Sequence, residues 1–305
     1  MGARPQDDDA QAEEAGSAPS DSGSPSEVTR SSYTPIFRAQ NEDRYLRQTL
    51  IREYEQHHSC NLVVLIDQIT QESVALFAEL LHGLDHSKDL HLMLASPGGD
   101  GGVAVRLARM AQEACRELVV LVPEIAKSAA TILALGAHEI VMSSSSDLGP
   151  IDPQVLVADR GWVSAKDLIA AVDNALQDVA VRADTYPLHV AMLAGVDSTA
   201  VEFARSALES TGELAEQAIV SNPDRTSEDV AAMCAIIKDP LISGPRSHAA
   251  VIGSREAERA GLPVRELRSD DSWWLEIWQL WARYYTLGPS YLLSAYEGAK
   301  ASQVR

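Results

Sequence analysis

The stretch LHLMLASPGGDGG, residues 90–102, decides the fold class of this chain. Its first six residues form an almost wholly apolar run of strand length, and a serine, a proline and glycines follow at once. Residues 101–115 then show the spacing of an alanine-rich helix. An apolar strand that ends in a glycine turn and leads into a helix is typical of a parallel α/β sheet.

The same alternation extends on both sides of this stretch. Residues 61–66, 118–122 and 139–142 are further strands, and residues 42–57, 72–84 and 128–136 are expected helices. The period near thirty residues predicts repeated βαβ units around a buried, mostly parallel sheet. From about residue 163 the pattern turns helical, with a capped helix opened by Ser164, helices near 186–218 and 227–237, a mixed segment over 248–264 and a helix over 271–287.

Three regions follow from composition. Residues 1–32 are rich in serine, proline, glycine and acids, which predicts a disordered acidic leader. Residues 33–265 form the main domain, and residues 266–305 form a tryptophan-rich helical segment. An apolar face of that segment packs on the core, forms an oligomer contact or touches a membrane surface, and we expect a homo-oligomer. The face comprises Trp274, Ile277, Trp278, Trp281 and Tyr285.

Charge and cysteine content exclude several classes of function. The formal net charge of −19 disfavours nucleic acids and anionic membrane surfaces as partners. No run of about 18 apolar residues and no apolar leader occur, so we expect a cytoplasmic protein without an integral membrane segment. The three cysteines are far apart and show no metal-ligand spacing. We therefore expect no metal and no organic cofactor.

Two turns at strand ends carry the candidate chemistry. The first, residues 96–102, has four glycines whose backbone amides could hold a phosphate or a developing oxyanion, or could simply form a tight turn. The second, VPEIAKSAAT over residues 122–131, places Ser128 where a helix begins. Ser128 is either a nucleophile beside the free Ala129 amide or an ordinary helix cap. The two turns lie one βαβ step apart, so they could project from adjacent strand ends. Together they match the arrangement that acyl transfer requires.

Three motifs together resemble the serine dehydrogenase proteinase family. They are Ser-Pro-Gly-Gly, then Val-Pro-x-x-Ala-x-Ser-Ala, then Leu-Gly-Pro-Ile-Asp-Pro-Gln at 148–154. That family is related to signal peptide peptidase A and to the caseinolytic protease subunit, within the crotonase-like superfamily. The resemblance covers roughly residues 60–157 strongly and continues weakly through His248–Val264. It implies a crotonase-like fold, an ATP-independent serine peptidase acting on peptides or polypeptides, Ser128 as nucleophile and an oxyanion hole from the amides of Gly99 and Ala129, supported by Gly98.

The chain departs from the family pattern at two positions. Ala130 stands where glycine is usual, and Glu124 stands where histidine is frequent. Two alternatives to an active peptidase stay open, the first of them because of these departures. One is a catalytically inactive member that acts as an oligomeric scaffold or binding module. The other is a crotonase-type acyl-CoA enzyme, which needs an oxyanion hole but no serine nucleophile.

The general base is the open question, because a serine hydroxyl needs a proton acceptor within hydrogen-bond reach. Asp152 occupies the place comparable to the histidine of the caseinolytic protease, so it either orients a partner or caps a turn. Signal peptide peptidase A uses a downstream lysine, and Lys166 is the only lysine between residues 128 and 237. The positive end of the helix opened by Ser164 disfavours a charged amine there, so Lys166 is either the base or an exposed surface lysine. Lys127, His248 and His138 are further candidates.

Overall fold

The computed structural model describes residues 34–158, 161–245 and 250–305. The chain divides into two compact units, residues 1–42 and 43–305. The described part of the first unit is the start of helix α2 (Pro35–His58), where Asn41 Nδ2 donates to the Phe37 carbonyl at 2.9 Å. The predicted leader, residues 1–32, lies outside the described residues. All that follows concerns the second unit.

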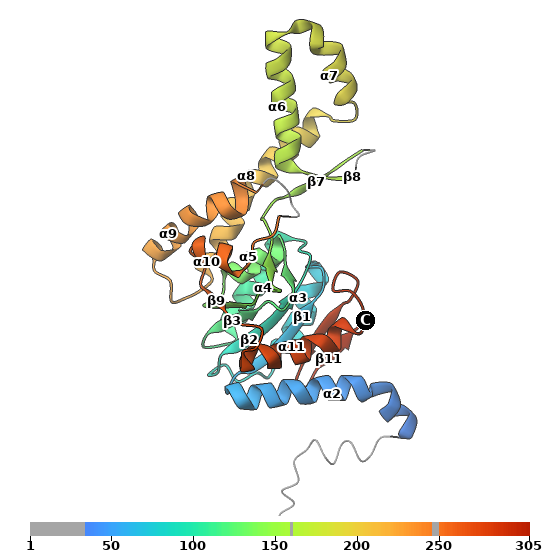
Figure 1. The fold of residues 1–305 in the computed structure, drawn as a ribbon, viewed down its shortest axis with the longest axis vertical. Coiled ribbons are helices and arrows are strands. Elements are labelled where there is room, and N and C mark those ends of the chain that lie inside the picture. Colours follow the sequence, from blue (N-terminus) through green and yellow to red (C-terminus); the bar gives the residue numbers. More distant parts are fainter. Residues whose placement is uncertain (1–33, 159–160, 246–249) are drawn as a thin grey trace, which may run out of the picture. The chain divides into compact units, whose positions relative to one another are not determined.

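A seven-stranded sheet forms the centre of this unit (Figure 1). Five neighbouring strands run parallel, in the order β1, β2, β3, β5, β9, and two strands at one edge run antiparallel. Their bounds are β1 Asn61–Ile66, β2 Leu90–Ala95, β3 Leu118–Leu121, β5 Glu139–Met142, β9 Val264–Glu266, β10 Ala295–Gly298 and β11 Ser302–Val304. The predicted α/β class with a mainly parallel sheet is therefore confirmed.

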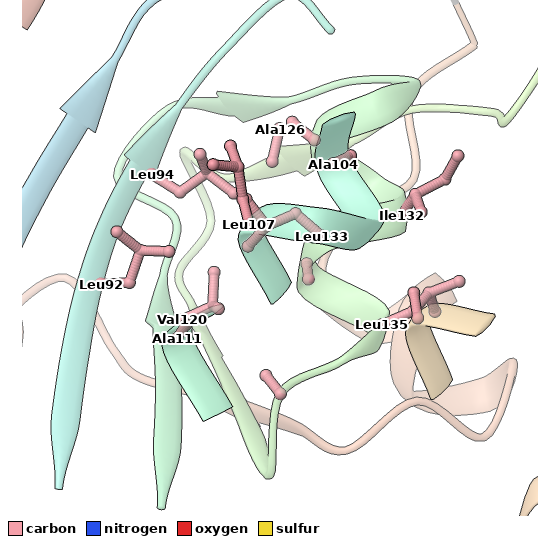
Figure 2. Packing of buried hydrophobic residues seen from close by; sticks show 14 of the residues in the cluster. Leu92, Leu94, Ala104, Leu107, Ala111, Val120, Ala126, Ile132, Leu133 and Leu135 are labelled. Carbon is pink, nitrogen blue, oxygen red and sulfur yellow. The ribbon is translucent and has the colours of Figure 1, made fainter. Parts of the chain in front are cut away.

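Helices α3 (Gln71–Leu81), α4 (Gly101–Glu113) and α5 (Ala129–Leu135) follow strands β1, β2 and β3 in turn, with the short strand β4 preceding α5. Their apolar residues pack on one face of the sheet, where Leu92 and Leu94 of β2 meet Leu107 of α4 and Leu133 of α5 (Figure 2). Small alanines on α4 and α5 let these two helices approach closely. This packing positions the start of α5, where Ser128 stands.

The opposite face of the sheet is covered by residues 43–58 of α2 and by α11 (Ser272–Tyr285). Trp274, Ile277 and Trp281 are buried there, so three members of the predicted apolar face are core residues. Trp278 and Tyr285 remain 43% and 64% exposed. The segment 266–305 is not only helical, since its strands β10 and β11 extend the central sheet.

The remaining elements lie mostly between β5 and β9. The hairpin β7–β8, the start of α6 and helix α8 share a small core of their own, and α8 and α9 also contribute to the main core. The region 186–218 holds two helices, separated near Gly195 at a positive φ of 89°. The bounds are β4 Ile125–Ala126, β6 Asp147–Leu148, β7 Gln154–Val157, β8 Gly161–Ser164, α6 Ala165–Val181, η1 Ala183–Thr185, α7 Tyr186–Met192, α8 Ser198–Val220, α9 Ser227–Ile237, η2 Lys238–Ser243 and α10 Ser254–Arg259.

Two further properties follow from the described residues. None of their helices is both long enough and apolar enough to cross a membrane. The three cysteines, Cys60, Cys115 and Cys234, are free thiols.

A hydrogen-bonded chain runs under the α2–α11 layer. Trp273 Nε1 donates to Tyr54 Oη at 2.7 Å, and Tyr54 Oη lies 2.7 Å from His91 Nδ1. Burial lowers the pKa of His91 to about 4, so its imidazole is neutral at neutral pH. A neutral imidazole can accept the phenolic proton, which gives the chain one direction from Trp273 through Tyr54 to His91.

A buried ion pair fastens α2 to strand β10. Arg47 Nε donates to Glu297 Oε2 at 2.6 Å, and the two side chains are 5% and 0% exposed. Tyr284 Oη donates to the same carboxylate oxygen at 2.7 Å. Burial and the neighbouring carboxylate keep the pKa of Tyr284 well above its usual value, so the phenol stays a donor.

Glu297→Gln is expected to destabilise the protein by about 3–5 kcal/mol, because it leaves the buried Arg47 cation without its counter-charge. Urea unfolding followed by circular dichroism measures the change. The control is Arg116→Ala, which breaks an Arg116–Asp89 pair whose arginine is 64% exposed and should cost less than about 1 kcal/mol. Equal losses in the two variants would show that burial of the Arg47–Glu297 pair is unimportant.

Candidate active site

The glycine turn after β2 is held on one side by the segment after β1. Ile69 N donates to the Gly98 carbonyl at 2.8 Å, and Asp100 N donates to the Ile69 carbonyl at 2.9 Å. These two bonds form a parallel bridge between Ile69 and Gly99. Since the bridge uses only the groups flanking Gly99 on its own strand, the N–H of Gly99 points away from Ile69.

The other side of the turn is held by the strand that leads to Ser128. Ser96 N donates to the Ile125 carbonyl at 2.9 Å, and Lys127 N donates to the Ser96 carbonyl at 3.0 Å. The two loops singled out in the sequence are thus joined by main-chain hydrogen bonds. Their relative position depends on the backbone and not on mobile side chains.

Glycine is required at both positions of the Gly98-Gly99 pair. Their φ angles are 107° and 140°, a region that residues with a side chain rarely adopt. A Cβ on Gly99 would lie 2.1 Å from the Ile69 carbonyl oxygen. A Cβ on Gly98 would lie 2.8 Å from Ser128 Cβ and 3.3 Å from Ala129 N. The absence of side chains therefore lets the turn lie directly against Ser128.

Ser128 has a strained backbone immediately before α5. Its φ and ψ are 51° and −114°, and it is one of two non-glycine residues with positive φ in the described part of the chain. Its hydroxyl makes no capping hydrogen bond to the helix. Strain of this kind costs on the order of 1–3 kcal/mol and persists where the surroundings impose it, often at functional sites. The helix-cap alternative does not account for this conformation.

Two main-chain N–H groups beside Ser128, those of Gly99 and Ala129, remain available as hydrogen-bond donors, whereas that of Gly98 does not. The N–H of Gly98 donates to Ser96 Oγ at 3.1 Å. For the N–H groups of Gly99 and Ala129, the structure records no acceptor among the residues it describes. A pair of unpaired amides next to a hydroxyl is what stabilises the oxyanion of an acyl-transfer reaction.

Two side chains that the sequence analysis did not single out support this arrangement. Thr131 Oγ1 lies 2.8 Å from the carbonyl oxygens of both Ala126 and Gly149, which ties the first turn of α5 to the loop after β6. Ser96 is fully buried and holds the Gly98 amide. The sequence signals were only the positions of the two hydroxyls, with Ser96 at the start of the glycine turn and Thr131 three residues after Ser128.

Lys127 is committed to an ion pair. Its Nζ donates to Asp147 Oδ2 and to the Ala250 carbonyl, the latter at 3.2 Å. The two side chains of the pair are only 15% and 16% exposed. A Cβ on Gly149 would lie 2.4 Å from Lys127 Cδ, so that glycine makes room for the lysine stem. These contacts favour a role for Lys127 in positioning the loop before Ser128 over a role as the general base.

Lys166 lies in the first turn of α6, as the sequence predicted. Its Nζ donates to the carbonyl oxygens of Ser243, at 3.4 Å, and Pro245. Within the described ranges, no hydrogen bond joins Lys166 to Ser128. Asp152 is buried and accepts a hydrogen bond from Ser164 Oγ at 3.0 Å, beside the start of the same helix.

The other candidates have different surroundings. His138 Nδ1 accepts from Leu118 N at 3.0 Å, and its Nε2 lies 3.2 Å from Asp224 Oδ2. Glu124 accepts a hydrogen bond from Ser290 Oγ at 2.8 Å. His248 lies outside the described residues. The structure thus brings Gly98, Gly99, Ser128 and Ala129 together, whereas Lys166 contacts the end of η2 and the residues after it, and Asp152 contacts Ser164 at the start of α6.

The fold and this turn define an α/β protein with a strained serine beside two amides that have no recorded acceptor among the described residues. Residues 83–175 match the family model of the ClpP-like SDH-type serine proteinases. That segment contains the glycine turn, Ser128, Asp152 and Lys166. The match confirms the family resemblance that the motifs indicated, and the α/β architecture is consistent with a ClpP-like fold.

Two relatives come from Methanocaldococcus jannaschii. The uncharacterized protein MJ0137 is 29% identical over 164 residues, which are 48% of this chain and 54% of the relative. The uncharacterized protein MJ1495 is 32% identical over 66 residues, 22% of this chain and 23% of the relative. The chain thus spans about half the length of the first relative and less of the second.

Proposed function

We propose that this protein is a serine hydrolase of the crotonase-like superfamily, and specifically a peptidase. The observation that carries the proposal is the convergence of a strained Ser128 with the free amides of Gly99 and Ala129. The match to a serine proteinase family supports peptides as the substrate class. The exposed Trp278 and Tyr285 on α11 are the residues through which we propose that a homo-oligomer forms.

In the proposed reaction, Ser128 Oγ attacks the scissile carbonyl carbon and gives its proton to a base. The carbonyl oxygen becomes negatively charged and accepts hydrogen bonds from the N–H groups of Gly99 and Ala129. The tetrahedral intermediate collapses, and the leaving amine departs with the proton from the base. The base then takes a proton from water, and the water oxygen attacks the carbonyl carbon of the Ser128 ester. The bond from that carbon to Ser128 Oγ breaks, and the base returns the proton to Oγ, which releases the acid and restores the serine.

Lys166 is the proposed base. It lies in the first turn of α6, inside the segment that matches the serine proteinase family, and its amine is the group that would take the Ser128 proton. Its present carbonyl contacts at Ser243 and Pro245 must be exchanged for Ser128 when substrate binds. Lys127 is the poorer candidate, because its Nζ is already paired with Asp147 and both side chains are largely buried.

A fluorophosphonate probe tests the proposed hydrolase. The probe forms a covalent bond with an activated serine, so the full chain should be labelled at a single site that peptide mapping places at Ser128. Hydrolysis of fluorogenic peptides should accompany labelling. A folded protein that neither reacts with the probe nor cleaves peptides would contradict the proposal.

Lys166→Ala is expected to lower peptide turnover at least about 100-fold, because the serine loses its proton acceptor. Combined with Ser128→Ala, it should lower turnover little further, since residues of one catalytic unit are not additive. Steady-state kinetics on a fluorogenic peptide measure both effects. Lys238→Ala, which removes a lysine from η2, is the control and should leave turnover unchanged. Near-normal turnover in Lys166→Ala would exclude it as base and leave Asp152 and His248 to be tested.

One observation favours a second function, that of a binding module without turnover. Among the residues that the structure describes, no base is hydrogen-bonded to the Ser128 hydroxyl. Such a module would bind peptide carbonyls at the Gly99 and Ala129 amides without cleaving them. It predicts peptide binding that survives Ser128→Ala together with no labelling by the probe.

A further inference from the structure

Two histidines and a glutamate meet on the sheet face opposite to the one on which α5 packs. His57 and His58 end α2, and Glu276 lies on α11. Glu276 Oε1 is 2.8 Å from His57 Nδ1, and its Oε2 is 2.9 Å from His58 Nε2. All three donor atoms lie within 4.8 Å of one another. The carboxylate therefore bridges two imidazoles that neighbour each other in sequence.

We propose that His57, His58 and Glu276 bind a divalent transition metal ion, with Zn²⁺ as the representative ion. Two imidazole nitrogens and one carboxylate oxygen suit zinc, nickel or copper, whereas calcium and magnesium require an oxygen-rich set. Ligand atoms about 2.1 Å from a tetrahedral ion are about 3.4 Å apart. Small side-chain movements would bring the three atoms to that spacing, and His57, with 66% of its side chain exposed, is free to make them.

The surroundings orient one ligand and leave space for others. The ring of His58 packs on Tyr54, with centroids 4.3 Å apart, and on Trp273, with centroids 5.6 Å apart. A cavity of about 160 Å³ borders the site and is lined by Glu53, His57 and Glu276 among others. Glu53 lies one helical turn before His57, on the same side of α2. Water or the Glu53 carboxylate can therefore complete the coordination.

Metal binding would displace protons from the two imidazoles and would stabilise the α2–α11 layer. Each imidazole nitrogen now facing Glu276 must be free of its proton before it can bind an ion, so protons and metal compete. The bound ion would join the end of α2 to α11 and stabilise the folded state. Ser128 starts a helix that packs on the other face of the sheet, so we assign the ion a structural role and none in acyl transfer.

Isothermal titration of the full chain with ZnCl₂, after treatment with chelator, tests the site. We expect one saturable site that persists in excess Ca²⁺, because calcium competes for carboxylates and not for imidazoles. At a hundredfold excess over Kd, the melting temperature should rise by about 5 °C. Ni²⁺ and Cu²⁺ should compete with Zn²⁺ for the same site.

Variants decide whether these three residues hold the ion. His57→Ala changes an exposed side chain, leaves the fold intact and should lower Zn²⁺ affinity at least tenfold, and Glu276→Gln should do the same. His86→Ala, at an exposed histidine between α3 and β2, is the matched control and should bind as the parent does. The proposal is overturned if no Zn²⁺ binds, if Ca²⁺ displaces it, or if His57→Ala and Glu276→Gln bind Zn²⁺ as tightly as the control.

Discussion

Ser128→Ala is expected to abolish labelling by the fluorophosphonate probe and to reduce peptide hydrolysis at least about 10³-fold. The variant removes the attacking oxygen but keeps a side chain at the strained position, so the fold should not change. Labelling on a gel and initial rates with a fluorogenic peptide measure the effect. Ser144→Ala, at an exposed serine after β5, is the control and should behave as the parent protein.

Ser128→Gly separates activity from stability at the same position. Glycine adopts a φ of 51° without the steric cost that serine bears. This variant should therefore be inactive and yet more stable than the parent by about 1 kcal/mol, measured by urea unfolding. Hydrolysis that persists in both variants would show that Ser128 is not the nucleophile. A glycine variant less stable than the alanine variant would show that the backbone strain is not real.

Gly99→Ala is expected to cost about 3 kcal/mol or more of folding stability and to abolish activity. The new Cβ would lie 2.1 Å from the Ile69 carbonyl oxygen, and a backbone atom within a bridge cannot move aside cheaply. The chain would have to break the Ile69–Gly99 bridge, which would displace the Gly99 amide from the proposed oxyanion hole. Unfolding curves and probe labelling measure the two losses.

Two further glycine variants give this prediction its controls. Gly83→Ala also has a positive φ, 77°, but its Cβ would meet nothing within 4 Å, so it should cost only about 1 kcal/mol and keep activity. Gly98→Ala would place its Cβ 2.8 Å from both Ser128 Cβ and the Lys127 carbonyl oxygen, so it should lower labelling as well as stability. If Gly99→Ala proves as mild as Gly83→Ala, the close approach between the glycine turn and Ile69 does not exist in solution.

Local patterns in the sequence were enough for several parallel strands of the sheet and for the choice of Ser128 as the candidate nucleophile. Strands β1, β2 and β5 begin and end where predicted, because strands buried on both faces are continuous apolar runs bounded by polar or turn residues. The turn at Ser128 was also predicted from a local pattern. A glycine turn and a serine at the start of a small-residue helix are signals that lie within a few residues of one another.

Tertiary structure alone decided which distant residues meet. Strand β10, AYEG, was not predicted, because its polarity is compatible with a central position only when Arg47 neutralises Glu297. The partner of Lys127 was equally hidden, since Asp147 lies twenty residues away. His58 and Glu276 are separated by 218 positions and meet because α2 and α11 cover the same face of the sheet. Periodicity reports which face of an element is buried, whereas the contacts between elements depend on how the whole chain packs.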